Sequence, residues 1–303
     1  MAALIVRADM SMLLQRIVSV DLFYLAVMFV IPHVMIGINT LKWQIFLREL
    51  GLRIDFNRLF GLYLIATFFN NFLPTMVGGD AVRAYALGRE TNDISSVTAA
   101  TFMERLVGFA GLVSLVPLVL FSTIVTDRFP TVWLIAPACL LGFALASAML
   151  LSSRFDPLWR RLRSIRKLAR LLEFLARTRK AVYRTAQSIQ ILLATYLLSL
   201  IFYVGAAGAV WAAAMSLGAD VGIGYLIATV PLVLVAGMLP VSLNGLGITE
   251  AGFAIFLQLA GVPLVDAVGV GLLLRARLLV TGLFGGLLFL RYRSARANMA
   301  IER

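Results

Sequence analysis

Residues 68–83 read FFNNFLPTMVGGDAVR and interrupt an apolar segment that would otherwise be long enough to cross a membrane. The apolar run before them ends at Pro74, which lacks the backbone N–H donor that a continuing helix needs. A short helical stretch to Glu90 is predicted after Gly78 and Gly79. We therefore expect a broken, re-entrant helical hairpin over 58–90. The alternative is an ordinary span that Pro and Gly merely kink.

The same interruption occurs a second time, at Leu239-Pro240, where residues 239–247 read LPVSLNGLG. This pattern predicts a second hairpin over 222–261. Each hairpin lies between two apolar spans, which gives two similar units, 19–131 and 188–290. A connecting span at 132–153 puts the two units in opposite orientations, and inverted repeats with broken helices are typical of transporters.

Bulk composition places the whole chain in a membrane. The 303 residues are 61% hydrophobic and 14% charged, whereas soluble domains carry about 25% charged residues. Several apolar runs reach the ~20 residues that a membrane-spanning helix needs. Helices are the expected spanning form, because strands would need a closed barrel with alternating polarity. The predicted fold class is an all-α polytopic transmembrane bundle forming a single integral membrane domain over 1–303.

The net charge of +12 is explained by loops that face the cytoplasm, which are rich in Lys and Arg, so no nucleic acid partner is expected. Within 154–184, eleven basic residues stand against two acidic ones. We expect the segment 154–187 and the basic tail 291–303 to be cytoplasmic, in a cell membrane. The first span is predicted at 20–39, with a cytoplasmic loop at 40–57. The segment 154–184 is either a topology-setting loop or an amphipathic helix that binds anionic inner-leaflet lipids.

Metal and cofactor chemistry is not expected. Cys139 and His33 are the only residues of their types, which excludes intrachain disulfides and His-based metal clusters. No nucleotide-binding glycine motif and no P-loop occurs in the sequence. An enzymatic function is therefore less favoured than a transport function.

Charged residues inside the apolar segments are the candidate site, because a charge at the membrane centre costs ~2.5–3.5 kcal/mol on insertion scales. Arg105 lies about ten residues into its span, Arg275 lies at a similar depth, and Arg83 follows Asp80 at the i+3 position. Half-helix starts favour anions, so we expect these three arginines to bind a lipid phosphate. We leave Arg277 unassigned.

The remaining candidates support this site. We expect Asp80, Glu104 and Glu250 to form a charge network and to cap the half-helices. The residues expected to break the helices and to expose or satisfy backbone groups are Asn70, Asn71, Pro74, Gly78, Gly79, Pro240, Asn244, Gly245 and Gly247. The alternative is a purely structural network, in which Asp80 pairs with Arg83 or Arg105, and Glu104 or Glu250 pairs with Arg275.

The motif NNxLPxxxGGDxxR at 70–83 resembles the lysylphosphatidylglycerol synthase transmembrane-region family, which is also called flippase-like. Weaker matches are Lys42-Trp43, Glu104-Arg105 and the stretch from Pro240 to Glu250. The resemblance implies movement of a modified lipid between leaflets, or a link to polyprenyl-lipid glycosylation or hopanoid pathways. The family usually has one more span before 20–39, and no soluble aminoacyl-transferase domain follows residue 303, so tRNA-dependent transfer is not expected.

We therefore expect a flippase-like transporter that moves or binds an anionic lipid, either a phospholipid or a polyprenyl-phosphate-linked lipid, at a midplane site. Two alternatives remain open. One is a lipid-linked glycosyl- or aminoacyl-transferase. The other is an accessory membrane subunit that presents lipid to a separate synthase or glycosyltransferase.

Overall fold

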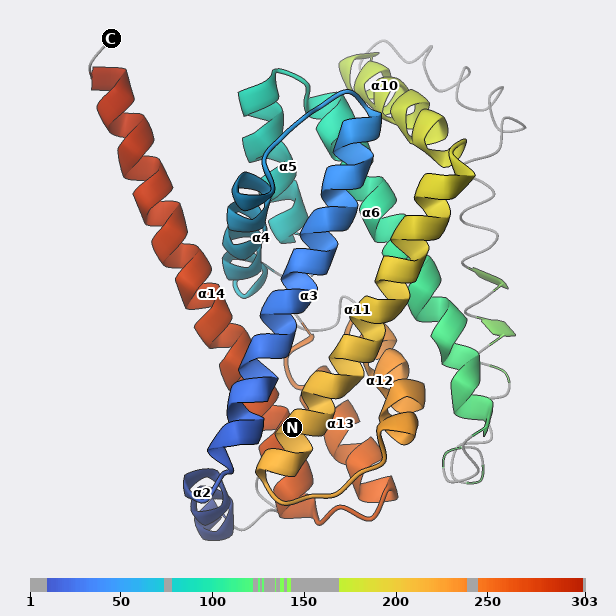
Figure 1. The fold of residues 1–303 in the computed structure, drawn as a ribbon, viewed down its shortest axis with the longest axis vertical. Helices are drawn as coiled ribbons and strands as arrows, with labels where there is room; N and C mark the ends of the chain where they lie inside the picture. The colour runs from blue at the N-terminus through green and yellow to red at the C-terminus, as the bar shows by residue number, and fades with distance from the viewer. Residues whose placement is uncertain are drawn as a thin grey trace.

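The computed structural model describes residues 10–73, 78–121, 169–238 and 245–301, with a few single positions between 125 and 142. All regular secondary structure in these ranges is helical (Figure 1), which confirms the all-α prediction for this part of the chain. Pro74, Pro240, Asn244, most of the predicted span 132–153 and the first part of the basic segment, 154–168, lie outside the described residues.

Four long helices dominate the described structure. They are α3 (Leu22–Glu49), α6 (Ile94–Leu115), which continues into the 3-10 helix η1 (Val116–Phe121), α11 (Ile189–Ser216) and α14 (Leu264–Ile301). Each contains a segment long and apolar enough to cross a membrane. A 28-residue segment extends over about 42 Å, more than the ~30 Å hydrocarbon core. The chain is a multi-pass helical membrane protein.

Helix α3 is longer than the sequence predicted. It runs on to Glu49 through residues that were expected to form a cytoplasmic loop. The prediction was wrong because Trp43, Phe46 and Leu47 lie at the i, i+3 and i+4 positions of one helix face and are fully buried. Their burial stabilises about three further helical turns, over residues whose charges had suggested a loop.

Six shorter helices complete the described fold: α2 (Met10–Val18), α4 (Phe56–Asn70), α5 (Gly78–Thr91), α10 (Ala169–Ala186), α12 (Ile223–Gly237) and α13 (Ile248–Leu259). The helices of each interrupted segment, α4 with α5 and α12 with α13, pack against each other. In Figure 1, the connections α3–α4 and α5–α6 lie at the upper end of the molecule, and the connections α11–α12 and α13–α14 lie at the lower end.

Two hydrophobic cores hold these helices together. One surrounds Trp43, Phe46, Leu62 and Met103 and joins α3, α4, α5 and α6, with residues of α10 and α11 packed against them. The other joins the first part of α3 to α11, α12, α13 and α14. Helices α3 and α11 contribute to both cores and pack along each other (Figure 1), so they form the common support of the two interrupted segments.

Helix α14 approaches α4 closely enough for their backbones to touch. A Cβ atom placed on Gly285 would lie 2.0 Å from the carbonyl oxygen of Leu64. Small residues permit such close helix contacts in membranes, where apolar burial between helices gives little driving force. At the same contact, Asn71 Nδ2 donates to the carbonyl oxygen of Leu278 at 3.4 Å. The end of α4 is thereby attached to α14.

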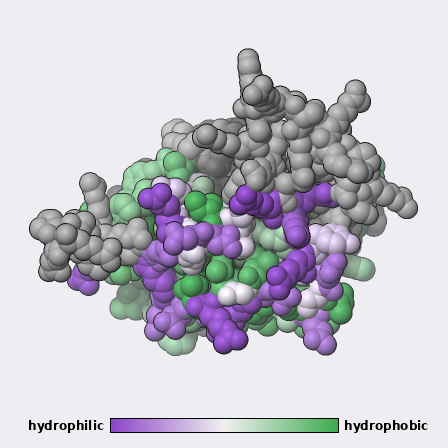
Figure 2. Space-filling view, turned by 90° about the horizontal axis from the view of Figure 1, so that it is seen from above, coloured by the Kyte–Doolittle hydropathy of each residue, from purple (hydrophilic) through white to green (hydrophobic). Residues whose placement is uncertain are grey.

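The upper end of the molecule in Figure 1 is polar. Figure 2 views this end from above and shows hydrophilic residues gathered over its described part. Helix α10 lies here (Figure 1) and packs on α6, with Val182 and Thr185 buried. Arg177, Lys180 and Arg184 lie on its exposed surface. This helix therefore presents positive charge away from the bundle.

Candidate functional site

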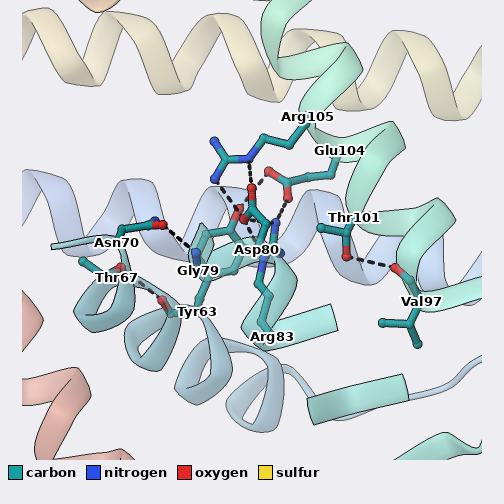
Figure 3. Close-up of polar contacts among 10 residues, drawn as sticks. All are labelled: Tyr63, Thr67, Asn70, Gly79, Asp80, Arg83, Val97, Thr101, Glu104 and Arg105. Atoms are coloured by element: carbon teal, nitrogen blue, oxygen red, sulfur yellow. Dashed lines mark hydrogen bonds and ion pairs between the residues drawn. The ribbon is translucent and has the colours of Figure 1, made fainter. Parts of the chain in front are cut away.

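Asp80 is the centre of a buried charge cluster at the start of α5. The residue is 3% exposed. Its Oδ1 atom accepts hydrogen bonds from Arg83 Nε at 3.0 Å and from Arg105 Nη2 at 2.9 Å, and its Oδ2 accepts from Arg105 Nε (Figure 3). Hydrogen bonds between ionised groups are about twice as strong as neutral ones. Asp80 therefore ties α5 firmly to α6.

Arg83 joins Asp80 to a second carboxylate. Its guanidinium donates to Glu104 as well as to Asp80, and Glu104 also accepts a hydrogen bond from the Tyr63 hydroxyl at 2.8 Å. The guanidinium lies 4.1 Å from the ring centroid of Tyr63 and 4.4 Å from that of Trp43, distances at which aromatic faces attract cations. The Arg83 side chain has no exposed surface, so it holds the cluster together rather than facing a ligand.

Arg105 differs from Arg83 in its exposure. Its side chain is 40% exposed although both Asp80 oxygens bind it. Lys42, the third cation nearby, is 2% exposed and donates to Ser199 Oγ at 3.1 Å. The cluster thus contains three cations and two carboxylates, and Arg105 is the cation with substantial accessible surface. An anion that enters this region would meet Arg105 first.

The local sequence explains how α5 begins at this place. A Cβ atom on Gly79 would lie 2.2 Å from the carbonyl oxygen of Ala66, so only glycine allows α5 to start against the backbone of α4. The Gly79 N–H donates to Asn70 Oδ1 at 2.7 Å. Asp80 was expected to cap α5. Asn70 instead accepts this backbone N–H, because both oxygens of Asp80 are directed towards arginines (Figure 3).

A smaller cluster lies at the start of α13. Glu250 accepts from the backbone N–H of Gly247 at 2.6 Å and from Arg275 Nε. Arg275 Nη2 also donates to Thr249 Oγ1 at 3.2 Å. Gly245 and Gly247 have φ angles of 69° and 83°, in the left-handed region that glycine adopts without strain. Glu250 thus caps α13 and fixes it to α14.

The three arginines that were expected to bind one phosphate belong to two ion-paired clusters. Arg83 and Arg105 share Asp80, whereas Arg275 pairs with Glu250. No hydrogen bond or ion pair between described residues joins the two clusters. Asn71 Nδ2 donates to the carbonyl oxygen of Leu278 on α14, and Gly78 lies beside Leu73.

Tyr63 and Lys42 belong to the first cluster although the sequence did not indicate their roles. Tyr63 lies seven residues before Asn70, which puts both on one face of α4. This spacing was the feature of the sequence that could have indicated a role for Tyr63. Across the described ranges, no group of three or more His, Cys, Asp and Glu residues could hold a metal ion.

These features define a class of protein: a multi-pass helical membrane protein with charged clusters buried beside two interrupted helices. The sequence model of the lysylphosphatidylglycerol synthase TM region family matches residues 1–286, which confirms the resemblance drawn from the motif at 70–83. The chain belongs to this family. No curated protein and no solved structure gives a significant match.

Proposed function

We propose that this protein is a flippase-like transporter that moves an anionic lipid, either a phospholipid or a polyprenyl-phosphate-linked lipid, and that Arg105 receives its phosphate. The observation that carries the proposal is the partial exposure of an arginine whose carboxylate partner is buried. Such an arginine is held in place yet keeps hydrogen-bonding capacity for a second anion. Its planar fork matches a phosphate in two parallel hydrogen bonds.

The depth of Arg105 supports a role within the membrane. It is the twelfth residue of α6, about 17 Å from the start of the helix and thus about half way across a ~30 Å core. A charged side chain at this depth is costly unless it meets a partner or a water-filled path. Asp80 offsets this cost while the site is empty, and the lipid phosphate shares the guanidinium when the site is filled.

The arrangement of the interrupted helices supports movement of the lipid between leaflets. We propose that α4 with α5 and α12 with α13 are re-entrant hairpins in two inverted repeats, each returning to the end of the molecule from which it entered. The connections at opposite ends in Figure 1 support this interpretation. Transporters with such repeats open alternately to the two sides around a central site.

Replacing Arg105 by alanine is expected to lower lipid exchange about tenfold to hundredfold, because charged hydrogen bonds contribute about 1.5–3 kcal/mol. Asp80 keeps Arg83 as a partner in this variant, so the fold should persist. The purified protein would be reconstituted into liposomes that contain fluorescent phosphatidylglycerol, and leaflet exchange would be followed by quenching from outside. Arg89→Ala is the matched control, since Arg89 lies on the exposed surface of α5.

The same liposomes separate the competing functions. Exchange by the wild type that is equal in Arg105→Ala would contradict the proposed site. Formation of a glycosylated or aminoacylated lipid after addition of an activated sugar or aminoacyl donor would support a transferase instead. Exchange or product formation only after addition of a separate synthase or glycosyltransferase would support an accessory subunit.

We also propose that the polar end with α10 faces the cytoplasm and that the basic segment 154–184 binds anionic lipids of the inner leaflet. Replacing Arg177, Lys180 and Arg184 together by glutamine removes three surface charges, each contributing about 1 kcal/mol near an anionic membrane. A peptide covering residues 169–186 is expected to lose most of its binding to phosphatidylserine vesicles after this change. Equal binding by both peptides in a sedimentation assay would contradict this role.

A further inference from the structure

Arg277 is a cation of α14 without a partner in the described structure. Its Nε atom is buried and makes no hydrogen bond, and no ion pair is formed by its guanidinium within the described ranges. The nearby Arg275 has both Glu250 and Thr249 as partners. Buried polar groups in native proteins are normally hydrogen-bonded, so this arginine needs an explanation that the Glu250 cluster does not supply.

Thr281, one helical turn later, also has a buried polar atom without a hydrogen-bond partner. The residue is 4% exposed, and its Oγ1 atom is buried without a hydrogen-bond partner. Thr229, by contrast, donates to the carbonyl oxygen four residues before it, at 2.9 Å. Residues at i and i+4 lie on one face of a helix. Arg277 and Thr281 therefore form a pair of adjacent unsatisfied groups, one cationic and one hydroxylic.

No acidic side chain of the described structure balances Arg277. Glu250 already accepts from Arg275 through one oxygen and from Gly247 through the other. Asp266 pairs with Arg16 and lies eleven residues before Arg277, about 16 Å away along the helix. This region therefore has one positive charge in excess. A partly buried excess charge is stabilised when an anion joins it.

We propose that Arg277 and Thr281 form a second anion subsite on α14, which binds a phosphate diester of a lipid headgroup. Arg277 donates through its guanidinium and Thr281 through its hydroxyl. Arg277 is the fourteenth residue of α14, about 20 Å from its start, a depth that favours a membrane lipid over a soluble anion. The identity of its ligand, an anionic lipid, rests on the proposed function. Binding at the subsite does not depend on transport or on Arg105.

The subsite predicts different effects of the substitutions on the melting temperature with and without lipid. Without lipid, Arg277→Met removes an unpaired cation, so the melting temperature should stay equal or rise. Arg275→Met should lower the melting temperature, because it leaves the Glu250 carboxylate buried without its cation. With lipid, Arg277→Met should lose at least about half of the stabilisation that the ligand gives through binding to the folded state.

The experiment uses the full chain in an uncharged detergent, with thermal unfolding followed after addition of phosphatidylglycerol, phosphatidylcholine or inorganic phosphate. Phosphatidylglycerol should raise the melting temperature of the wild type and of Arg89→Met. The rise should shrink in Arg277→Met and, by a smaller amount, in Thr281→Val, which keeps the size of the side chain. A rise in melting temperature with inorganic phosphate that depends on Arg277 would support a phosphate-binding subsite that also accepts a soluble anion.

A full phosphatidylglycerol response in both Arg277→Met and Thr281→Val would overturn the subsite. An equal response to phosphatidylcholine would also overturn it, because the headgroup charge would then play no part. Failure of lipid exchange in the liposome assay, with an Arg277-dependent response retained, would refute the transport proposal and leave the subsite standing.

Discussion

Replacing Arg83 by methionine is expected to destabilise the folded protein by about 3–5 kcal/mol, the usual cost of leaving buried charges without their partner. Arg83 has no exposed surface, and it is the only described residue that bonds both Asp80 and Glu104. Methionine fills much of the volume between Trp43 and Tyr63 but leaves the Glu104 carboxylate with the Tyr63 hydroxyl alone. Thermal unfolding of the purified protein in detergent measures the effect.

A second substitution tests whether charge, rather than packing, causes this loss. The double variant Arg83→Met with Glu104→Met removes the stranded carboxylate and should be more stable than Arg83→Met alone. Arg89→Met, an exposed position on the same helix, should unfold within about 0.5 kcal/mol of the wild type. A double variant less stable than the single one would show that Arg83 acts mainly through its aromatic contacts.

Replacing Gly285 by alanine is expected to break the contact between α4 and α14. The new methyl group would lie 2.0 Å from the carbonyl oxygen of Leu64, and a backbone atom cannot move aside as a flexible side chain can. Overpacking typically costs about 1–3 kcal/mol, and the helices must separate to relieve it. The measurement is again thermal unfolding, together with the yield of monodisperse protein on size-exclusion chromatography.

Gly61 provides the matched control within α4. A Cβ atom at Gly61 meets nothing within 4 Å, so Gly61→Ala should stabilise the helix by about 0.5–1 kcal/mol. The two alanine substitutions are thus expected to act in opposite directions. A Gly285→Ala variant as stable as the wild type would mean that α14 does not approach α4 as closely as described.

Local signals in the sequence predict re-entrant hairpins over 58–90 and 222–261. In the described structure, α4 begins at Phe56 and α5 ends at Thr91, while α12 begins at Ile223 and α13 ends at Leu259. Proline and glycine carry this information because they restrict or free the backbone at their own positions. The same signals could not separate α3 from the loop expected after residue 39, since burial of Trp43 depends on helices far away in the chain.

The partners inside the charge clusters were harder to predict than the charges themselves. Asp80 and Arg83 are three residues apart, and their contact follows from helical spacing. The contact of Arg83 with Glu104 joins residues 21 apart, and that of Tyr63 with Glu104 joins residues 41 apart. A single sequence with several buried acids and bases does not determine which helices are neighbours, so Glu104 and Glu250 were left as alternative partners of Arg275.

The two attachments on α14 have a mechanical consequence. Leu278 accepts the hydrogen bond from Asn71 at the end of α4, and Arg275 holds Glu250 at the start of α13. These points are three residues apart, about 4.5 Å along the axis. A sliding or tilting of α14 would therefore displace both attachment points together. Neither interrupted segment could shift far without moving the other through α14.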